Sequence, residues 1–188
     1  MDKKTLRRQM SAVRASIENK DDKNRKIFDK VIDLSREISA KKIFCYASMV
    51  SEVDTKRILS YYISKSETTL YVPYTDSEMK LKRLISCENL SVDKLGNLPL
   101  AAYSSEFYDG DVDMTVVPML AFNANLYRLG YGGGYYDRFL SSHKTVAVGI
   151  AFDEQETELL EVEKHDIPLD YIVTPMRILR RTNEQKSR

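Results

Sequence analysis

Short runs that are apolar on both faces recur along this chain and limit the folds open to it. In the 188-residue sequence they lie at residues 42–47, 69–72, 114–117, 145–150 and 171–173. Each run has the length and the β-branched or aromatic content of a strand, and polar residues do not alternate with apolar ones. The second and third should stop at Pro73 and Pro118, because proline cannot donate to a strand ladder. Strands of this kind are typical of a mostly parallel sheet that helices cover.

Helical periodicity fills the stretches between these runs. Apolar residues at helical spacing predict helices over residues 3–17 and 24–39, and shorter ones over 55–63 and from about Tyr135 onward. Residues 79–84 alternate apolar and basic side chains, which predicts a half-exposed strand, antiparallel at an edge of the sheet. The sequence therefore predicts an α/β fold, and its length suits one domain over residues 1–188.

Composition argues against several classes of protein. A net charge of +1 is not that of a general nucleic-acid binder. No apolar run reaches the roughly 20 residues needed to span a bilayer, and no signal-peptide core follows the first residues. The two cysteines, Cys45 and Cys87, lie far apart and match neither a disulfide framework nor a zinc spacing. We therefore expect a cytoplasmic protein, a monomer, with no membrane or nucleic-acid partner.

Charge is unevenly distributed along the chain. Residues 3–42 hold 13 Lys or Arg against six Asp or Glu, whereas residues 153–170 hold eight acidic residues and one lysine. On the predicted first helix, Lys3, Arg7 and Arg14 fall within one narrow sector beside the apolar stripe, since each residue turns the helix by about 100°. This basic sector is either a solvated face or, together with the acidic segment, part of a site for a metal-bound nucleotide.

Four of the chain's seven glycines lie in one loop. The loop reads RLGYGGGYYDR over residues 128–138, just before a predicted helix. Glycine lets backbone N–H groups approach a phosphate, and a helix N-terminus adds positive potential. The loop is neither a P-loop nor the GxGxxG fingerprint, which would need glycine at Tyr135. A tight turn that leads into a helix would explain the glycines as well, and the helix dipole alone would explain Asp137 in the first turn.

A longer stretch around this loop resembles a known family. Residues 117–140, VPMLAFNANLYRLGYGGGYYDRFL, resemble nearly residue for residue the signature of the 5-formyltetrahydrofolate cyclo-ligase family, whose members are also called methenyltetrahydrofolate synthetases. Further blocks follow the family's order: KKTLRR at 3–8, SEVDT at 51–55, VGIAFDEQ at 148–155, HD at 165–166 and IVT at 172–174. One departure is Leu98 before Pro99, where many members have glutamate.

The resemblance implies a three-layer α/β/α sandwich with a mostly parallel central sheet. It also implies an enzyme that converts 5-formyltetrahydrofolate to 5,10-methenyltetrahydrofolate while ATP, with magnesium, becomes ADP and phosphate. In the implied mechanism the formyl oxygen attacks the γ-phosphate, N10 of the folate closes the ring on the resulting iminium phosphate, and phosphate leaves. Such chemistry needs positioning and charge neutralisation more than a protein nucleophile.

The same resemblance implies roles for individual residues. The implied ATP-binding residues are Lys3, Lys4, Arg7, Arg128, Leu129, Gly130, Tyr131, Gly132, Gly133, Gly134, Tyr135 and Tyr136. The implied folate contacts are Glu52, Ala47 and Tyr135, and the implied catalytic residues are Arg128 and Tyr135. Asp137 and Asp166 are the implied magnesium ligands.

Two other functions stay open. A protein of the same fold could bind folate or a nucleotide without turnover. A protein without turnover would be expected to lack Asp137, Arg128 or the N-terminal lysines, and this sequence has all of them. An RNA-associated module could use the basic N-terminal helices, but aromatic residues do not interleave with the basic ones there.

Overall fold

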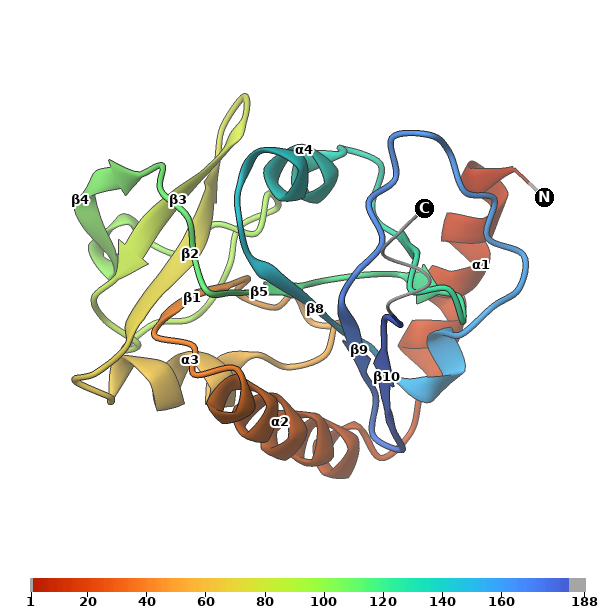
Figure 1. The fold of residues 1–188 in the computed structure, drawn as a ribbon, viewed down its shortest axis with the longest axis horizontal. Coiled ribbons are helices and arrows are strands. Elements are labelled where there is room, and N and C mark those ends of the chain that lie inside the picture. Colours follow the sequence, from red (N-terminus) through yellow and green to blue (C-terminus); the bar gives the residue numbers. More distant parts are fainter. Residues whose placement is uncertain (1, 183–188) are drawn as a thin grey trace.

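An eight-stranded sheet with helices on both faces forms the centre of the molecule (Figure 1). The structure is a computed structural model and describes residues 2–182. The strands of this sheet are β1 (Lys42–Cys45), β2 (Thr69–Thr75), β3 (Met79–Leu84), β4 (Tyr103–Tyr108), β5 (Met114–Val117), β8 (Val146–Ile150), β9 (Tyr171–Val173) and β10 (Ile178–Arg180). Their order is β10-β9-β8-β5-β1-β2-β3-β4. The five strands from β9 to β2 are parallel, whereas β10 at one end and β3 and β4 at the other are antiparallel.

Helices cover the two faces of the sheet, as the predicted three-layer sandwich requires. Helices α2 (Lys20–Glu37) and α3 (Lys56–Ile63) lie against one face, and α4 (Tyr135–Ser142) lies against the other (Figure 1). Helix α1 (Lys3–Ser16) packs beside them on the small hairpin of β6 (Ala121–Phe122) and β7 (Arg128–Leu129) and near the short helix η2 (Asp153–Gln155). A second short helix, η1 (Leu100–Ala102), precedes β4. Within residues 2–182, no helix has both the length and the apolar character of a membrane span.

Strand β1 shows why its sequence is apolar on both faces. Ile43 and Cys45 point into the core that α2 and α3 cover. Phe44, between them, points to the opposite face and packs edge-on against Phe139 of α4, with ring centroids 5.0 Å apart. Because successive side chains of a strand alternate between faces, a strand buried between two helical layers has no polar face.

The structure corrects several predicted boundaries. Strand β2 continues through Pro73 to Thr75. Its pairing with β1 ends at Tyr71, so the missing N–H of Pro73 costs no hydrogen bond to β1. Strand β3 is antiparallel as predicted, but β4 forms the edge of the sheet. Helix α2 begins at Lys20, earlier than residue 24, because its first turn is polar and the apolar stripe starts only at Ile27.

Candidate active site

A cavity of about 610 Å³ opens at the carboxyl ends of the central parallel strands. Tyr46 and Ala47 follow β1, Pro118 follows β5, and Thr75 ends β2; all four line the cavity. Parallel strands end at one edge of the sheet, so the loops that follow them converge there, and ligands of α/β sheets bind at this edge. The topology therefore places a binding site where the sequence clusters its unusual residues.

Almost every residue expected at the site lines this one cavity. These residues are Lys3, Arg7, Ala47, Glu52, Arg128, Leu129, Gly130, Tyr131, Gly132, Gly133, Gly134, Tyr135, Tyr136, Asp137 and Asp166. The exception is Lys4, which is exposed and does not belong to the lining. The fold thus brings together residues from the start, the middle and the end of the chain, and their individual roles stay predictions.

The glycine-rich loop, residues 130–134, connects β7 to α4 and is held against α1. The Arg7 Nε donates a hydrogen bond to the Gly130 carbonyl over 2.9 Å. Gly132 has a φ of +107°, and a Cβ there would lie 3.3 Å from the guanidinium carbon of Arg7. Gly134, with a φ of +64°, directly precedes α4. A side chain would therefore be strained at both positions, and at Gly132 it would also meet the close approach of a cation.

Replacing Gly132 with alanine should distort this loop and weaken nucleotide binding. Alanine is strained at this φ by about 1 to 3 kcal/mol, so the loop is expected to shift away from Arg7. Gly130→Ala is the comparison within the same loop, because a Cβ there meets nothing within 4 Å and its φ is not positive, so that it adds a methyl group without the backbone strain. ATP titrations of both variants test the loop: equal affinities in the two variants would contradict this role for Gly132.

Arg128 and Asp137 form an ion pair at the wall of the cavity. The Arg128 side chain is only 4% exposed, and its Nη2 donates to Oδ1 of Asp137 over 2.9 Å. Its Nη1 donates to the carbonyl of Ile167 over 2.9 Å, and the Ile167 N–H donates to the same Oδ1 of Asp137 over 3.1 Å. Burial lowers the pKa of Arg128, and the Asp137 carboxylate opposes that shift. The pair thereby joins β7, α4 and the segment before β9 into one wall.

Lys3 and Asp166 form a second ion pair across the cavity mouth. The Lys3 Nζ donates to Oδ2 of Asp166 over 2.9 Å and lies 3.3 Å from a carboxylate oxygen of Glu163. Burial alone would raise the pKa of Asp166, but the Glu163 backbone N–H and the Lys3 ammonium outweigh it, so that this pKa lies below its ordinary value. Burial would likewise lower the pKa of Lys3, but the bonds to the two carboxylates raise it. Both groups are therefore charged near neutral pH.

The carboxylates at this end of the cavity have the chemistry of a magnesium site. The hydrogen bonds among the described residues use Oδ1 of Asp137 and Oδ2 of Asp166, so that each carboxylate keeps its other oxygen available. Glu163, His165 and Asp166 also bring ligand atoms within 4.8 Å of one another. Oxygen donors of this kind, supplemented by phosphate and water, suit Mg²⁺. The residues present therefore fit the ion that the resemblance implies, with Glu163 as an addition that sequence reasoning missed.

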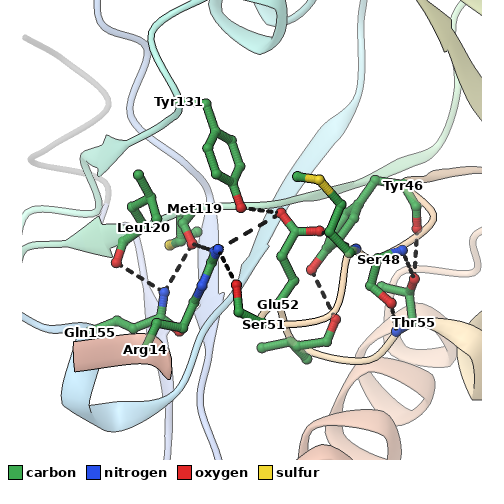
Figure 2. Close-up of polar contacts among 12 residues, drawn as sticks. Arg14, Tyr46, Ser48, Ser51, Glu52, Thr55, Met119, Leu120, Tyr131 and Gln155 are labelled. Carbon is green, nitrogen blue, oxygen red and sulfur yellow. Dashed lines mark hydrogen bonds and ion pairs between the residues drawn. The ribbon is translucent and has the colours of Figure 1, made fainter. Parts of the chain in front are cut away.

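Glu52 also lines the cavity and belongs to a buried polar network (Figure 2). Its residue surface is 5% exposed, and its Oε2 accepts a hydrogen bond from the Met49 N–H over 2.8 Å. The other oxygen, Oε1, accepts from the Tyr131 hydroxyl of the glycine-rich loop. Burial and the nearby Glu52 charge raise the pKa of Tyr131, which keeps its hydroxyl protonated. A fixed, desolvated carboxylate of this kind can accept hydrogen bonds from a ligand's N–H groups.

Arg14 belongs to this network, which corrects the predicted basic face of the first helix. Lys3 and Arg7 do line the cavity, but Arg14 does not. Its side chain is buried in the apolar stripe of α1, where it follows Leu6 and Met10 at intervals of four residues. The sequence predicts Arg14 beside the apolar stripe, on a solvated face or at a nucleotide site, whereas the structure places it within the stripe. Tertiary contacts from residues 51, 52 and 119 bury it instead.

Leu98, the departure from the family pattern, does not reach the cavity. It is 5% exposed within the main core, and its N–H donates to the Tyr103 hydroxyl over 2.7 Å. The wall near this point is formed instead by Lys94, Leu95 and Gly96. Where many family members have glutamate, this chain therefore has an apolar side chain that lies in the core, beneath the cavity wall.

Comparisons with known proteins agree with the resemblance. The sequence model described as the 5-formyltetrahydrofolate cyclo-ligase family matches residues 1–175. A 5-formyltetrahydrofolate cyclo-ligase of Mycoplasma genitalium is 30% identical over 175 residues, which cover 92% of this chain and 98% of that protein. The one of Escherichia coli K12 is 30% identical over 159 residues, 75% of this chain and 81% of that protein.

A solved structure shares the fold over nearly the whole chain. The NMR structure of 5,10-methenyltetrahydrofolate synthetase from Aquifex aeolicus superimposes with a TM-score of 0.81 at 29% sequence identity. The match covers 97% of this chain and 94% of that one. Sequence, fold and the residues of the cavity agree, and the chain belongs to the 5-formyltetrahydrofolate cyclo-ligase family.

Proposed function

We propose that this protein converts 5-formyltetrahydrofolate to 5,10-methenyltetrahydrofolate while ATP, in the presence of Mg²⁺, is converted to ADP and phosphate. The observation that carries the proposal is the composition of one cavity. Its lining combines a glycine-rich loop and the cations Lys3 and Arg7 with the buried acid Glu52. A reaction between a triphosphate and a folate needs both kinds of group in one cavity, because the two substrates must meet.

The nucleotide end supplies positive charge and backbone donors. Lys3 and Arg7 lie in the first two turns of α1 and line the cavity, where Arg7 contacts the glycine-rich loop. Backbone N–H groups of that loop and the N-terminus of α4 suit phosphate oxygens. Phosphoryl transfer depends mainly on positioning and charge neutralisation, which these groups provide without a protein nucleophile.

The folate end supplies a hydrogen-bond acceptor of fixed orientation. The Met49 N–H holds one oxygen of Glu52, which leaves its carboxylate aligned along the cavity wall. The amino and ring N–H groups of a pterin can donate to such a carboxylate, and Ala47 and Tyr135 complete the surface around the ring. A folate held in this way would present its formyl group to the glycine-rich loop, whose Tyr131 contacts Glu52.

The proposed reaction balances without any further co-reactant. The formyl oxygen attacks the γ-phosphorus, and ADP leaves with the electrons of the broken P–O bond. The N10 atom then attacks the activated formyl carbon and loses its proton, and phosphate leaves with the former formyl oxygen. Arg128 and Tyr135 lie beside the loop and would orient the transferring group. Mg²⁺, held by Asp137 and Asp166, would neutralise charge on the phosphates when bound.

Turnover of the purified protein tests the proposal. We expect methenyl product, followed by its absorbance, when 5-formyltetrahydrofolate, ATP and Mg²⁺ are all present, with one ADP released for each product molecule. Omitting ATP or Mg²⁺ should abolish the signal. Binding of both ligands without product would instead support a protein that has kept the fold and lost turnover.

Replacing Lys3 with methionine should raise the KM for ATP. The change removes a positive charge that the structure places between two carboxylates at the cavity mouth. A lost charge-assisted contact costs about 1.5 to 3 kcal/mol, which corresponds to roughly 10- to 100-fold in KM. Arg8→Met, on the exposed side of the same helix, is the control. Steady-state kinetics at saturating folate measure this, and an unchanged KM for ATP would remove Lys3 from the nucleotide site.

The remaining expectations about the whole protein stay predictions. They are one domain over residues 1–188, a monomer, and a cytoplasmic location without a nucleic-acid or membrane partner. Sedimentation equilibrium at enzyme concentrations of the assay would test the oligomeric state directly.

A further inference from the structure

We propose that Arg14 is a positioning residue for folate: it fixes the carboxylate of Glu52 without itself touching the ligand. This inference rests on the proposed function of Glu52 and assigns a role to a residue outside the cavity lining. Figure 2 shows Arg14 reaching from α1 towards Ser51, Glu52 and Tyr131.

The guanidinium of Arg14 connects three separate parts of the chain. Its Nη2 donates to the Ser51 hydroxyl over 2.8 Å, one residue before Glu52. Its Nη1 donates to the Met119 carbonyl over 3.2 Å and lies 4.0 Å from Oε1 of Glu52. A planar fork with fixed donor directions holds two partners in a defined relation, which a lysine cannot do. Arg14 therefore ties the loop that carries Glu52 to the end of β5.

Arg14 also acts on the same carboxylate oxygen, Oε1 of Glu52, indirectly through Tyr131. The guanidinium carbon lies 5.5 Å from the centre of the Tyr131 ring, within the range of a cation–π contact. The hydroxyl of that ring donates to Oε1 of Glu52. The cation thus supports both the acid and the loop residue that contacts it (Figure 2).

Stability of the core does not explain an arginine at this position. The side chains of Arg14 and Glu52 are each 4% exposed, and burying charges costs free energy that a close pair only partly recovers. Among the described residues, Nε of Arg14 has no hydrogen-bond partner although it is buried. An apolar residue would continue the stripe of Leu6 and Met10 without this penalty. Compared with an apolar residue, the arginine adds the contacts with Ser51 and Glu52.

The positive charge also makes a buried, ionised Glu52 tolerable beside the cavity. A carboxylate taken out of water needs a nearby cation or several hydrogen bonds. Arg14 is the cation that the structure places against Glu52, and the Met49 N–H and Tyr131 hydroxyl supply the hydrogen bonds. Without Arg14, Glu52 should turn towards solvent in the cavity and lose the orientation that a pterin requires.

Calorimetric titration of four single variants tests this role. Arg14→Met should weaken binding of 5-formyltetrahydrofolate by about tenfold or more, the scale of losing a charged hydrogen-bond partner. Its affinity for ATP should fall much less than its affinity for folate, because Arg14 contacts the glycine-rich loop only through the Tyr131 ring. Arg14→Lys keeps the charge without the planar guanidinium, and its folate affinity should lie between those of wild type and Arg14→Met. Ser51→Ala should also lower folate affinity, but by less than Arg14→Met. Arg8→Met is the control on the exposed side of α1 and should bind both ligands like wild type.

A double-mutant cycle separates positioning from a general effect on the fold. In a Glu52→Gln background, Arg14→Met should cost less than about twofold in folate affinity, because its partner is already gone. An equal cost in both backgrounds, or an equal loss of folate and ATP affinity, would overturn the proposal. If Arg14→Met does not fold, Arg14→Lys and Ser51→Ala decide: full folate affinity in both would overturn it. Wild-type protein that binds no folate would refute the proposed function instead.

Discussion

Replacing Asp137 with asparagine should lower turnover by about a hundredfold or more, the scale of removing one electrostatic stabiliser of a transition state. Asparagine keeps the size of the side chain and one oxygen to accept from the Ile167 N–H. It removes the negative charge that faces the cavity and pairs with Arg128. If that charge holds Mg²⁺, the Mg²⁺ concentration for half-maximal turnover should rise as well. Steady-state assays over a range of Mg²⁺ concentrations measure both effects.

The ion pair with Arg128 adds a cost in stability to this variant. The helix dipole alone would make a first-turn carboxylate worth about 0.3 to 1 kcal/mol. Leaving the nearly buried Arg128 without its acid should cost about 1 to 3 kcal/mol in the free energy of unfolding. Asp21→Asn, in the exposed first turn of α2, is the control for the dipole effect and should not alter turnover. Near wild-type turnover of Asp137→Asn with unaltered Mg²⁺ dependence would leave Asp166 and Glu163 as the remaining candidate ligands.

Replacing Glu52 with glutamine should weaken folate binding by roughly 10- to 100-fold, the factor that corresponds to losing a charge-assisted hydrogen bond. The amide keeps one acceptor for the Met49 N–H, so the loop should stay in place, but it presents an N–H group where the pterin needs an acceptor. ATP affinity should remain within about twofold of wild type. Titrations of each ligand separately would show this.

The matched control for Glu52 is Glu67→Gln, an exposed residue in the loop before β2. It makes the same chemical change away from the cavity and should bind folate and ATP like wild type. The reverse pattern in Glu52→Gln, with ATP binding lost and folate binding kept, would place Glu52 at the nucleotide instead.

The sheet could be predicted from sequence because its central strands are buried on both faces. The apolar runs that contain Phe44 and Val116 are strands in the structure, and their helical neighbours are helices. What periodicity missed is structure without a repeating apolar face. The hairpin of β6 and β7 has two-residue strands, and the edge strand β4 is largely exposed, so neither has a run long enough to detect.

Most of the candidate site could be predicted as well, but only through the family resemblance. Four glycines in one loop fit a tight turn as well as a phosphate site, and the positive φ of Gly132 and Gly134 favours glycine there for either reason. Arg14 could not be placed, because its partners Ser51 and Met119 lie 37 and 105 residues away along the chain. Contacts at such separations are set by the fold, and helical spacing alone cannot distinguish an exposed arginine from a buried one.

The fate of the formyl oxygen tests the central claim most directly. In the proposed reaction this oxygen attacks the γ-phosphorus and leaves with phosphate after N10 closes the ring. Turnover of 5-formyltetrahydrofolate labelled with ¹⁸O in the formyl group should therefore place the label in the released inorganic phosphate, as mass spectrometry of that phosphate would show. Unlabelled phosphate, with the ¹⁸O released as water, would contradict phosphoryl transfer to the formyl group and with it the proposed meeting of ATP and folate in this cavity.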